Sequence, residues 1–256
     1  MPPISSSAVL LRRIDHGDYD LILTFFTPGR GRLSAVAKSA KKSRRRFAGV
    51  LELFSVVDIV CSYGRGRGLP VLQEATLKKG FAGIRGDLMR TAYASYWAQL
   101  IADWSEEGQA VEPLYRLFLH CLARLDEGRR NPEAVSMLFQ IRLLSIAGLA
   151  PNLAGCRRCG RALQDLDSER FFFDLAGGDI DCESCGPGSG RPIGLSKATV
   201  RQILWAQEGG LAKADRIRFS PQAVAEGGRL LEAFVPFHLG KEPRSLKFLR
   251  QVRGAR

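Results

Sequence analysis

The sequence has no hydrophobic run long enough to cross a membrane and no recognisable leader. Its apolar stretches fall well short of the roughly 20 residues that a membrane-spanning helix needs. Residues 1–5 are not a basic segment followed by an apolar one, so no signal peptide is predicted. We therefore expect a cytoplasmic protein of 256 residues, 45% of them apolar, with enough chain to bury a substantial core.

Side chains typical of catalysis are also scarce. The chain has three histidines, His16, His120 and His238, and the sequence identifies no catalytic partner for any of them. It lacks the G-x-x-x-x-G-K-[ST] motif, which excludes a P-loop ATPase. We therefore expect a protein that is not an enzyme.

One acidic cluster leaves an alternative open. Asp15, Asp18 and Asp20 could bind Mg²⁺ in a metal-dependent nuclease. Because Gly17 lies among them, a turn between two strands is the favoured interpretation. Cleavage of DNA that depends on Mg²⁺ would distinguish the two.

Acidic residues are missing from residues 24–51, where basic residues accumulate. The whole chain carries 38 Lys and Arg against 26 Asp and Glu, a net charge of +12. The basic surplus lies in residues 1–80 and 195–256, which favours a surface that meets a polyanion rather than a device for solubility. The candidate DNA-binding residues are Arg30, Arg32, Lys38, Lys41, Lys42, Arg44, Arg45, Arg46, Arg65 and Arg67.

The first 80 residues are patterned as strands. Five short runs rich in apolar, β-branched and aromatic residues alternate with turn residues, and they cover residues 8–11, 21–27, 33–37, 51–63 and 71–77. This pattern favours a five-stranded OB-fold barrel, whose rim loops can follow a single strand of nucleic acid. Phe47, beside the basic stretch, is the aromatic residue that we expect to be exposed for stacking on bases; Phe25, Phe26 and Tyr63 are further candidates, mostly expected in the core.

From about residue 84 the apolar spacing becomes helical. Helices are expected over about 84–104, over about 114–125, and from Asn131-Pro132 to Gly148. Two more are expected over about 196–207 and from residue 220, with Pro236 kinking or ending the last one.

Four of the six cysteines form two C-x-x-C pairs, each followed by glycine. Cys156, Cys159, Cys182 and Cys185 supply the four soft ligands of a tetrahedral Zn²⁺ site, with a hairpin between the pairs, as in a zinc ribbon. Four thiolates leave no open coordination position, so one structural zinc ion is predicted. Two redox pairs or two disulfides are the alternative, but the helix start that a redox pair needs is missing.

The predicted architecture is therefore α+β. It comprises an N-terminal OB-fold barrel that binds nucleic acid over residues 1–80, a helical domain over 81–152 and an inserted zinc finger over 153–194. A C-terminal helical part over 195–256 is expected to pack with residues 81–152.

The order of several short motifs resembles the bacterial RecO family over nearly the full chain. They include Asp15-x-Gly17-Asp18-Tyr19-Asp20, Gly31-Arg32 and the two C-x-x-C pairs. Near the end the resemblance includes Arg244-Ser245-Leu246-x-Phe248-Leu249. The family resemblance implies an OB-fold, a helical domain and a zinc-binding insert.

The resemblance also implies a function in DNA repair without catalysis. Such a protein binds single- and double-stranded DNA and anneals complementary strands. With RecR it helps RecA load onto DNA coated by the single-stranded-DNA-binding protein, which implies a nucleoid-associated cytoplasmic location. A zinc-ribbon transcription or translation factor with an OB-fold is a further alternative, and an annealing assay separates the two.

A docking site for the acidic tail of the coat protein is a further implication. Such a tail needs an apolar pocket beside cations. The candidate residues for the rim are Arg124, Arg129, Arg130 and Arg142. The competing interpretation is that these arginines form ordinary surface pairs with Asp126, Glu127 and Glu133.

Overall fold

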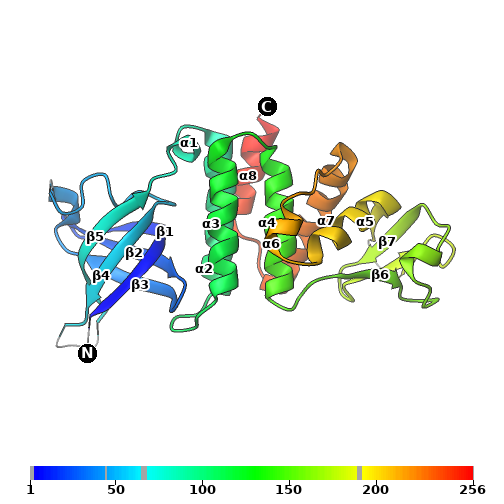
Figure 1. Cartoon of the computed structure of the whole chain (residues 1–256), viewed down its shortest axis with the longest axis horizontal. Helices are drawn as coiled ribbons and strands as arrows, with labels where there is room; N and C mark the ends of the chain where they lie inside the picture. Colours follow the sequence, from blue (N-terminus) through cyan, green and yellow to red (C-terminus); the bar gives the residue numbers. More distant parts are fainter. Residues whose placement is uncertain (1–2, 44, 65–67, 189–191, 256) are drawn as a thin grey trace. The chain divides into compact units, whose positions relative to one another are not determined.

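The computed structural model describes residues 3–43, 45–64, 68–188 and 192–255 (Figure 1). The chain forms two compact units, one built from residues 1–128 and 243–256 and the other from residues 129–242. Within the described ranges, no helix combines the length and the apolar character that crossing a membrane requires. The four-part division expected from the sequence remains a prediction.

The N-terminal strands close into a barrel. They are β1 (Ile4–His16), β2 (Asp20–Thr27), β3 (Gly31–Ala37), β4 (Val56–Ser62) and β5 (Val71–Lys79), in the order β1-β2-β3-β5-β4. All neighbours are antiparallel except β3 and β5, which meet in parallel at Val36 and Val71. Alternate residues of β2 and β3 fill the interior, as period-two patterning dictates. The predicted OB-like barrel is confirmed.

The fourth strand is shorter than its sequence pattern predicts. Residues 51–55 are not part of it; they form a turn over β1 in which Phe54 has a φ of 68°. The Phe54 N–H donates to the carbonyl of Leu10 at 2.8 Å, and the Leu10 N–H donates to the carbonyl of Ser55 at 3.1 Å. The apolar character of this segment therefore reflects burial of Leu51 and Phe54, not strand pairing.

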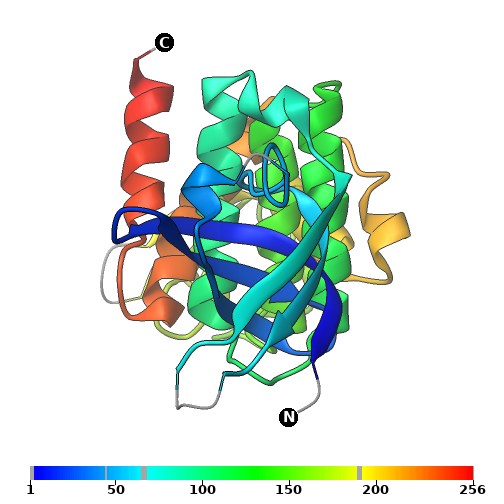
Figure 2. The same ribbon diagram turned by 90° about the vertical axis from the view of Figure 1, so that its left-hand side faces the viewer.

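The described part of the first unit also contains the α-helices α1 (Ala82–Arg85), α2 (Leu88–Trp104), α3 (Glu112–Glu127) and α8 (Arg244–Gly254). Figure 2 shows them behind the barrel. Asp87 caps α2 by accepting a hydrogen bond from the Arg90 N–H at 3.0 Å. The chain end joins this unit through α8, where the Ser245 N–H donates to the side-chain oxygen of Gln99 at 2.9 Å.

The second unit combines helices with a small sheet. Its elements are α4 (Pro132–Ile146), β6 (Asn152–Cys156), β7 (Arg170–Asp174), β8 (Asp179–Cys182), β9 (Ile193–Ser196), α5 (Lys197–Gln207), α6 (Leu211–Ala214) and α7 (Pro221–Leu239). The sheet order is β6-β8-β7-β9, and β7 and β8 form the expected hairpin. The Asn131 side chain caps α4 as predicted. Pro236 does not end α7, which continues for three more residues to Leu239.

Candidate metal centre and nucleic-acid interface

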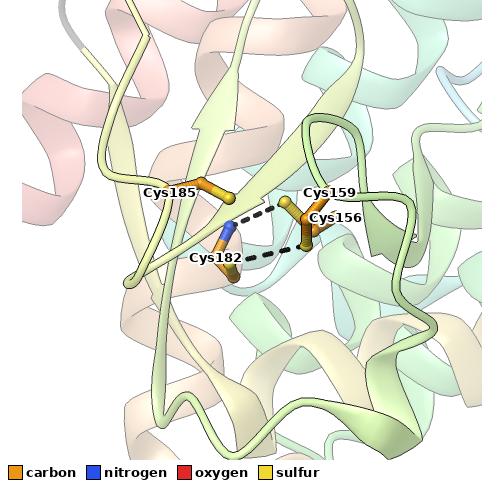
Figure 3. A group of neighbouring side chains, drawn as sticks. All are labelled: Cys156, Cys159, Cys182 and Cys185. Atoms are coloured by element: carbon orange, nitrogen blue, oxygen red, sulfur yellow. Dashed lines mark hydrogen bonds between the residues drawn. The ribbon is translucent and has the colours of Figure 1, made fainter.

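The four cysteines of the C-x-x-C pairs converge on one point of the second unit. Cys156 ends β6 and Cys182 ends β8, and each strand is followed by a tight turn that carries the second cysteine of its pair (Figure 3). Gly160 and Gly186 complete these turns with φ near 70°, a conformation that glycine adopts without strain. All four sulfur atoms lie within 4.8 Å of one another. A tetrahedral zinc–thiolate site requires sulfur separations of roughly 3.8 Å, so the cluster fits a metal ion.

Backbone N–H groups already favour thiolate at one of these positions. Burial opposes ionisation of Cys156, but hydrogen bonds from the N–H groups of Cys159, Cys182 and Arg158 lower its pKa to about 6. The Cys182 N–H lies 3.3 Å from the Cys156 sulfur (Figure 3). Interaction with Cys182, followed by burial, raises the pKa of Cys185 to about 12. Because metal ligands must be deprotonated, a cation bound at the centre would stabilise the Cys185 thiolate and release the proton of this thiol.

Two arginines inside the first pair hold the two turns together. The guanidinium of Arg158, in the first C-x-x-C turn, donates to the carbonyl of Cys185, in the second turn, at 2.8 Å. The Asp181 carboxylate, almost completely buried, lies 3.4 Å from Arg157 and 3.5 Å from Arg158. These contacts orient the ligand-bearing turns from outside the sulfur cluster.

The basic loop, residues 38–46, follows β3 and packs against the turn that joins β1 to β2. The Lys41 ammonium is 3.1 Å from an Asp15 carboxylate oxygen and donates to the Gly17 carbonyl at 3.1 Å. The Lys42 ammonium lies 3.5 Å from the centre of the Tyr19 ring. The Ser39 N–H donates to the Asp20 carboxylate at 2.7 Å. The loop is therefore anchored to the barrel, with Lys38, Lys41, Lys42, Arg45 and Arg46 exposed.

Strand register places this loop at one end of the barrel with two other connections. Leu21 pairs with Ala37, and Val36 pairs with Val71, so the β1–β2 turn, the end of β3 and the start of β5 are neighbours. The Val36 N–H donates to the Pro70 carbonyl at 2.9 Å, so the end of the β4–β5 connection also lies beside β3. In OB-folds the loops at this end contact nucleic acid. Arg44, Arg65 and Arg67 lie outside the described residues.

The expected exposure of Phe47 is wrong. Its ring is 4% exposed and lies in the barrel core, because the loop turns inward after Arg46, whose guanidinium stacks 4.4 Å from the ring centre. Phe25 and Phe26 are fully buried. Among the described residues at this end, the exposed aromatic side chains are Tyr63, at 39%, and Tyr19, at 46%. Tyr63 was a candidate from the sequence, whereas Tyr19 was not. The sequence did contain a signal for the exposure of Tyr19. It lies between Asp18 and Asp20 in a polar turn, where a side chain is not expected to be part of the core.

Arg30 and Arg32 lie away from the rest of the predicted DNA-binding set. They belong to the turn where Thr27 pairs with Gly31, six residues along β2 from Leu21, or about 20 Å at strand geometry. The Arg32 guanidinium donates to the carbonyl of Ala102 at 2.8 Å, at the end of α2. Arg30 is exposed. The structure therefore separates these two arginines from the basic loop.

Comparison with known proteins matches both parts of the chain to one family. The model for "Recombination protein O N terminal" matches residues 1–81, and that for "Recombination protein O C terminal" matches residues 85–247. A DNA repair protein RecO of Desulfatibacillum aliphaticivorans is 46% identical over 99% of this chain and 98% of its own length. Its counterpart in Desulfosudis oleivorans is 40% identical over 99% of both chains.

The chain belongs to the RecO family of DNA repair proteins. The resemblance found in the sequence is thereby confirmed over nearly the full length. Within this RecO chain, the cysteine cluster is the only group of three or more potential metal ligands among the described residues. Asp15 and Asp20 instead anchor the basic loop, so the geometry gives the nuclease alternative no metal site built from the three aspartates.

The four arginines suggested for the tail-binding rim are spread over both units of this RecO chain. Arg124 pairs with Glu127 at 3.1 Å on α3, in the first unit. In the second unit, Arg130 pairs with Asp215 at 3.1 Å, and Arg142 donates to the carbonyl of Gln207 at 2.6 Å. Partial burial lowers the pKa of Arg142. Arg129 is exposed.

Proposed function

We propose that this RecO chain is a recombination mediator that works without catalysing a reaction. It binds single- and double-stranded DNA, anneals complementary strands, and helps RecA load with RecR onto DNA coated by the single-stranded-DNA-binding protein. Its site of action is the nucleoid of the bacterial cytoplasm. The observation that carries the proposal is the anchored basic loop beside the exposed Tyr19 ring.

This loop has the properties that annealing requires. Two DNA strands repel each other through their phosphates, and exposed cations on a rigid support neutralise both and release counterions without ATP. Contacts must go mainly to the backbone, because base edges have to remain free to pair. Lys and Arg side chains that rise from a loop held by Asp15 and Asp20 meet phosphates in this way.

The cysteine cluster is proposed to hold one structural Zn²⁺ ion. Four thiolates supply a soft tetrahedral set with no position left for water or substrate, so the ion stabilises the fold and does no chemistry. The support comes from the sulfur separations and from the lowered pKa of Cys156.

Docking of the coat protein's acidic tail on some of the four arginines Arg124, Arg129, Arg130 and Arg142 is also a proposal. Since Arg130 and Arg142 hold other parts of their own unit, the informative single variant is Arg129→Ala. Titration of the tail peptide should then show weakened binding. Unchanged binding by this variant and by Arg124→Ala would move the site elsewhere, with Arg244, Lys247 and Arg250 of α8 as the next candidates.

Annealing of complementary oligonucleotides tests the proposed function directly. The wild type should accelerate annealing without ATP and in the presence of a Mg²⁺ chelator. Changing Lys41, Lys42, Arg44, Arg45 and Arg46 to Ala should slow annealing and weaken DNA binding for every sequence alike. The slope of log affinity against log salt is negative, and it should become shallower by roughly 0.7–0.9 for each lost phosphate contact.

Two single variants, Lys42→Ala in the loop and Arg116→Ala outside it, separate the loop from general charge. Arg116→Ala removes an exposed cation of α3 that pairs with Glu112, in the same unit as the barrel. It should leave annealing unchanged. Equal effects of both variants, or cleavage of DNA once Mg²⁺ is added, would contradict the proposal.

A further inference from the structure

A shallow pocket in the second unit has no part in the function proposed above. It has a volume of about 310 Å³ and is lined by Arg201, Gln202 and Trp205 of α5 and by Arg216 and Ile217, which follow α6. Trp205 and Ile217 are half-buried, whereas both arginines are exposed. The pocket thus presents an indole ring and an aliphatic side chain between two guanidinium groups.

The cations of this pocket are free to meet an external ligand. The guanidinium groups of Arg201 and Arg216 form no hydrogen bond or ion pair with any residue that the structure describes. The ammonium of Lys213 lies 5.5 Å from the centre of the Trp205 ring, where a stacking group would lie, and 3.6 Å from Glu208. Because Lys213 is exposed and flexible, a flat ligand can displace it at little cost.

The walls of the pocket are held in place by other contacts. The Ser220 N–H donates to the side-chain oxygen of Gln202 at 2.9 Å, and the amide nitrogen of Gln202 donates back to the Ser220 hydroxyl at 3.3 Å. On the other side, Asp215 next to Arg216 pairs with Arg130 at 3.1 Å. The segment that carries Arg216 and Ile217 is therefore fixed against α5, so little order must be gained on binding.

We propose that this pocket is a second contact site for single-stranded DNA, with a base stacked on Trp205 and adjoining phosphates against Arg201 and Arg216. The proposal rests on the proposed function in that DNA is the ligand. Base–aromatic stacking does not depend on the base sequence, and one planar guanidinium group can donate two parallel hydrogen bonds to the oxygens of a phosphate. The surrounding charge agrees, because the acidic residues Glu208 and Asp215 are outnumbered within residues 197–218 by Lys197, Arg201, Lys213, Arg216 and Arg218.

Photo-crosslinking locates the contact independently of the barrel. A single-stranded oligonucleotide carrying 5-iodouracil is irradiated with the full-length protein, and with a variant in which Lys41, Lys42, Arg45 and Arg46 are Ala. Mass spectrometry should find a crosslinked peptide that contains Trp205 in both. If the barrel does not bind DNA, crosslinks there will be missing while the one at Trp205 remains, so the two proposals fail separately.

Affinity measurements in the four-residue loop variant used for crosslinking complete the test. The double change Arg201→Ala and Arg216→Ala should reduce the salt slope by roughly 0.7 per lost phosphate contact on a single strand. Trp205→Ala should weaken binding roughly 5- to 150-fold, and Trp205→Phe, which keeps an aromatic face, should restore most of it. Arg229→Ala, an exposed cation on α7 outside the pocket, is the matched control and should change nothing.

Several outcomes would overturn the proposal. One is an absence of crosslinks at Trp205 while the oligonucleotide still binds. Another is an equal affinity and salt slope for the double arginine variant and for Arg229→Ala; this comparison holds even if Trp205→Ala does not fold. A third is an acidic peptide ending in apolar residues that needs Arg201 and Arg216 when the oligonucleotide does not, which would assign the pocket to a protein partner.

Discussion

The ammonium of Lys41 lies 3.1 Å from a carboxylate oxygen of Asp15, so one cation of the basic loop is partly neutralised by the barrel that carries it. This pairing orients the loop but reduces the net positive charge that the loop would present to the proposed DNA ligand. The loop is thus a compromise between rigidity and electrostatic attraction, and the compromise can be shifted experimentally.

Asp15→Asn should tighten DNA binding by releasing Lys41. We expect an increase in affinity of a few-fold, with a salt slope steeper by up to roughly 0.9 if Lys41 gains one phosphate contact. Asp18→Asn is the control, because it removes an equal charge from the same turn and frees no lysine. If both variants bind equally well, net charge and not the release of Lys41 explains the gain.

Arg32→Ala should reduce stability and leave DNA affinity unchanged. The guanidinium of Arg32 donates to the Ala102 carbonyl in the last turn of α2, where a cation also meets the negative end of the helix dipole. Its loss should lower the free energy of unfolding by about 1–2 kcal/mol. Denaturant titration measures this, with Arg30→Ala in the same turn as a control that should unfold like the wild type. Weaker DNA binding by a folded Arg32→Ala protein would return Arg32 to the DNA interface.

Cys159→Ser should lower zinc content and loosen residues 151–194 while the barrel stays folded. Metal analysis of freshly purified, reduced protein should give one zinc per wild-type chain, and limited proteolysis should cut the variant selectively in that segment. Cys61→Ala removes a thiol buried in the barrel and should keep the metal. Wild-type protein without zinc would show that the cluster has another role.

Acid should weaken the second unit through Glu226. Burial alone would raise the pKa of Glu226, but hydrogen bonds from Ser196, Thr199 and Gln222 to its carboxylate lower it overall. A carboxyl group with a lowered folded-state pKa contributes stability above its ordinary value of about 4.3, and this stability is lost as the pH falls through the folded-state pKa.

The corresponding variant is Glu226→Gln. It should cost about 1–2 kcal/mol in the free energy of unfolding near pH 7, and the difference from wild type should shrink below about pH 4. Glu169→Gln, which changes an exposed carboxylate, should show no such dependence. A difference that stays constant from pH 7 to pH 3 would contradict the assignment.

Local patterns predicted most of the fold, because strand alternation, helix caps and cysteine spacing are written in neighbouring residues. The strands, the Asn131 cap and the convergence of the four cysteines follow from such patterns. The errors occurred where distant segments decide. Residues 51–55 have a strand-like pattern, but their hydrogen bonds to Leu10 form a turn. Phe47 was expected to be exposed, but its loop places it in the barrel core.

The candidate DNA interface was predictable as a charge excess but not as a geometry. Sequence alone put Arg32 in the same set as Lys38, because nothing nearby reveals that Arg32 reaches a carbonyl 70 residues further along the chain. Likewise, the Trp205 pocket requires Arg216 to return to α5 after the intervening helix α6. Such assignments depend on tertiary contacts that no local pattern encodes.

The return of α8 to α2 has a consequence for synthesis on the ribosome. Gln99 accepts a hydrogen bond from Ser245, which is synthesised 146 residues later. The segment 129–242 is synthesised between the two. The inserted unit can therefore fold while α2 still lacks the helix that covers it. The nascent N-terminal unit would expose the apolar surface that packs against Leu246 and Leu249 until α8 leaves the exit tunnel, so completion of the barrel-containing unit is coupled to the end of translation.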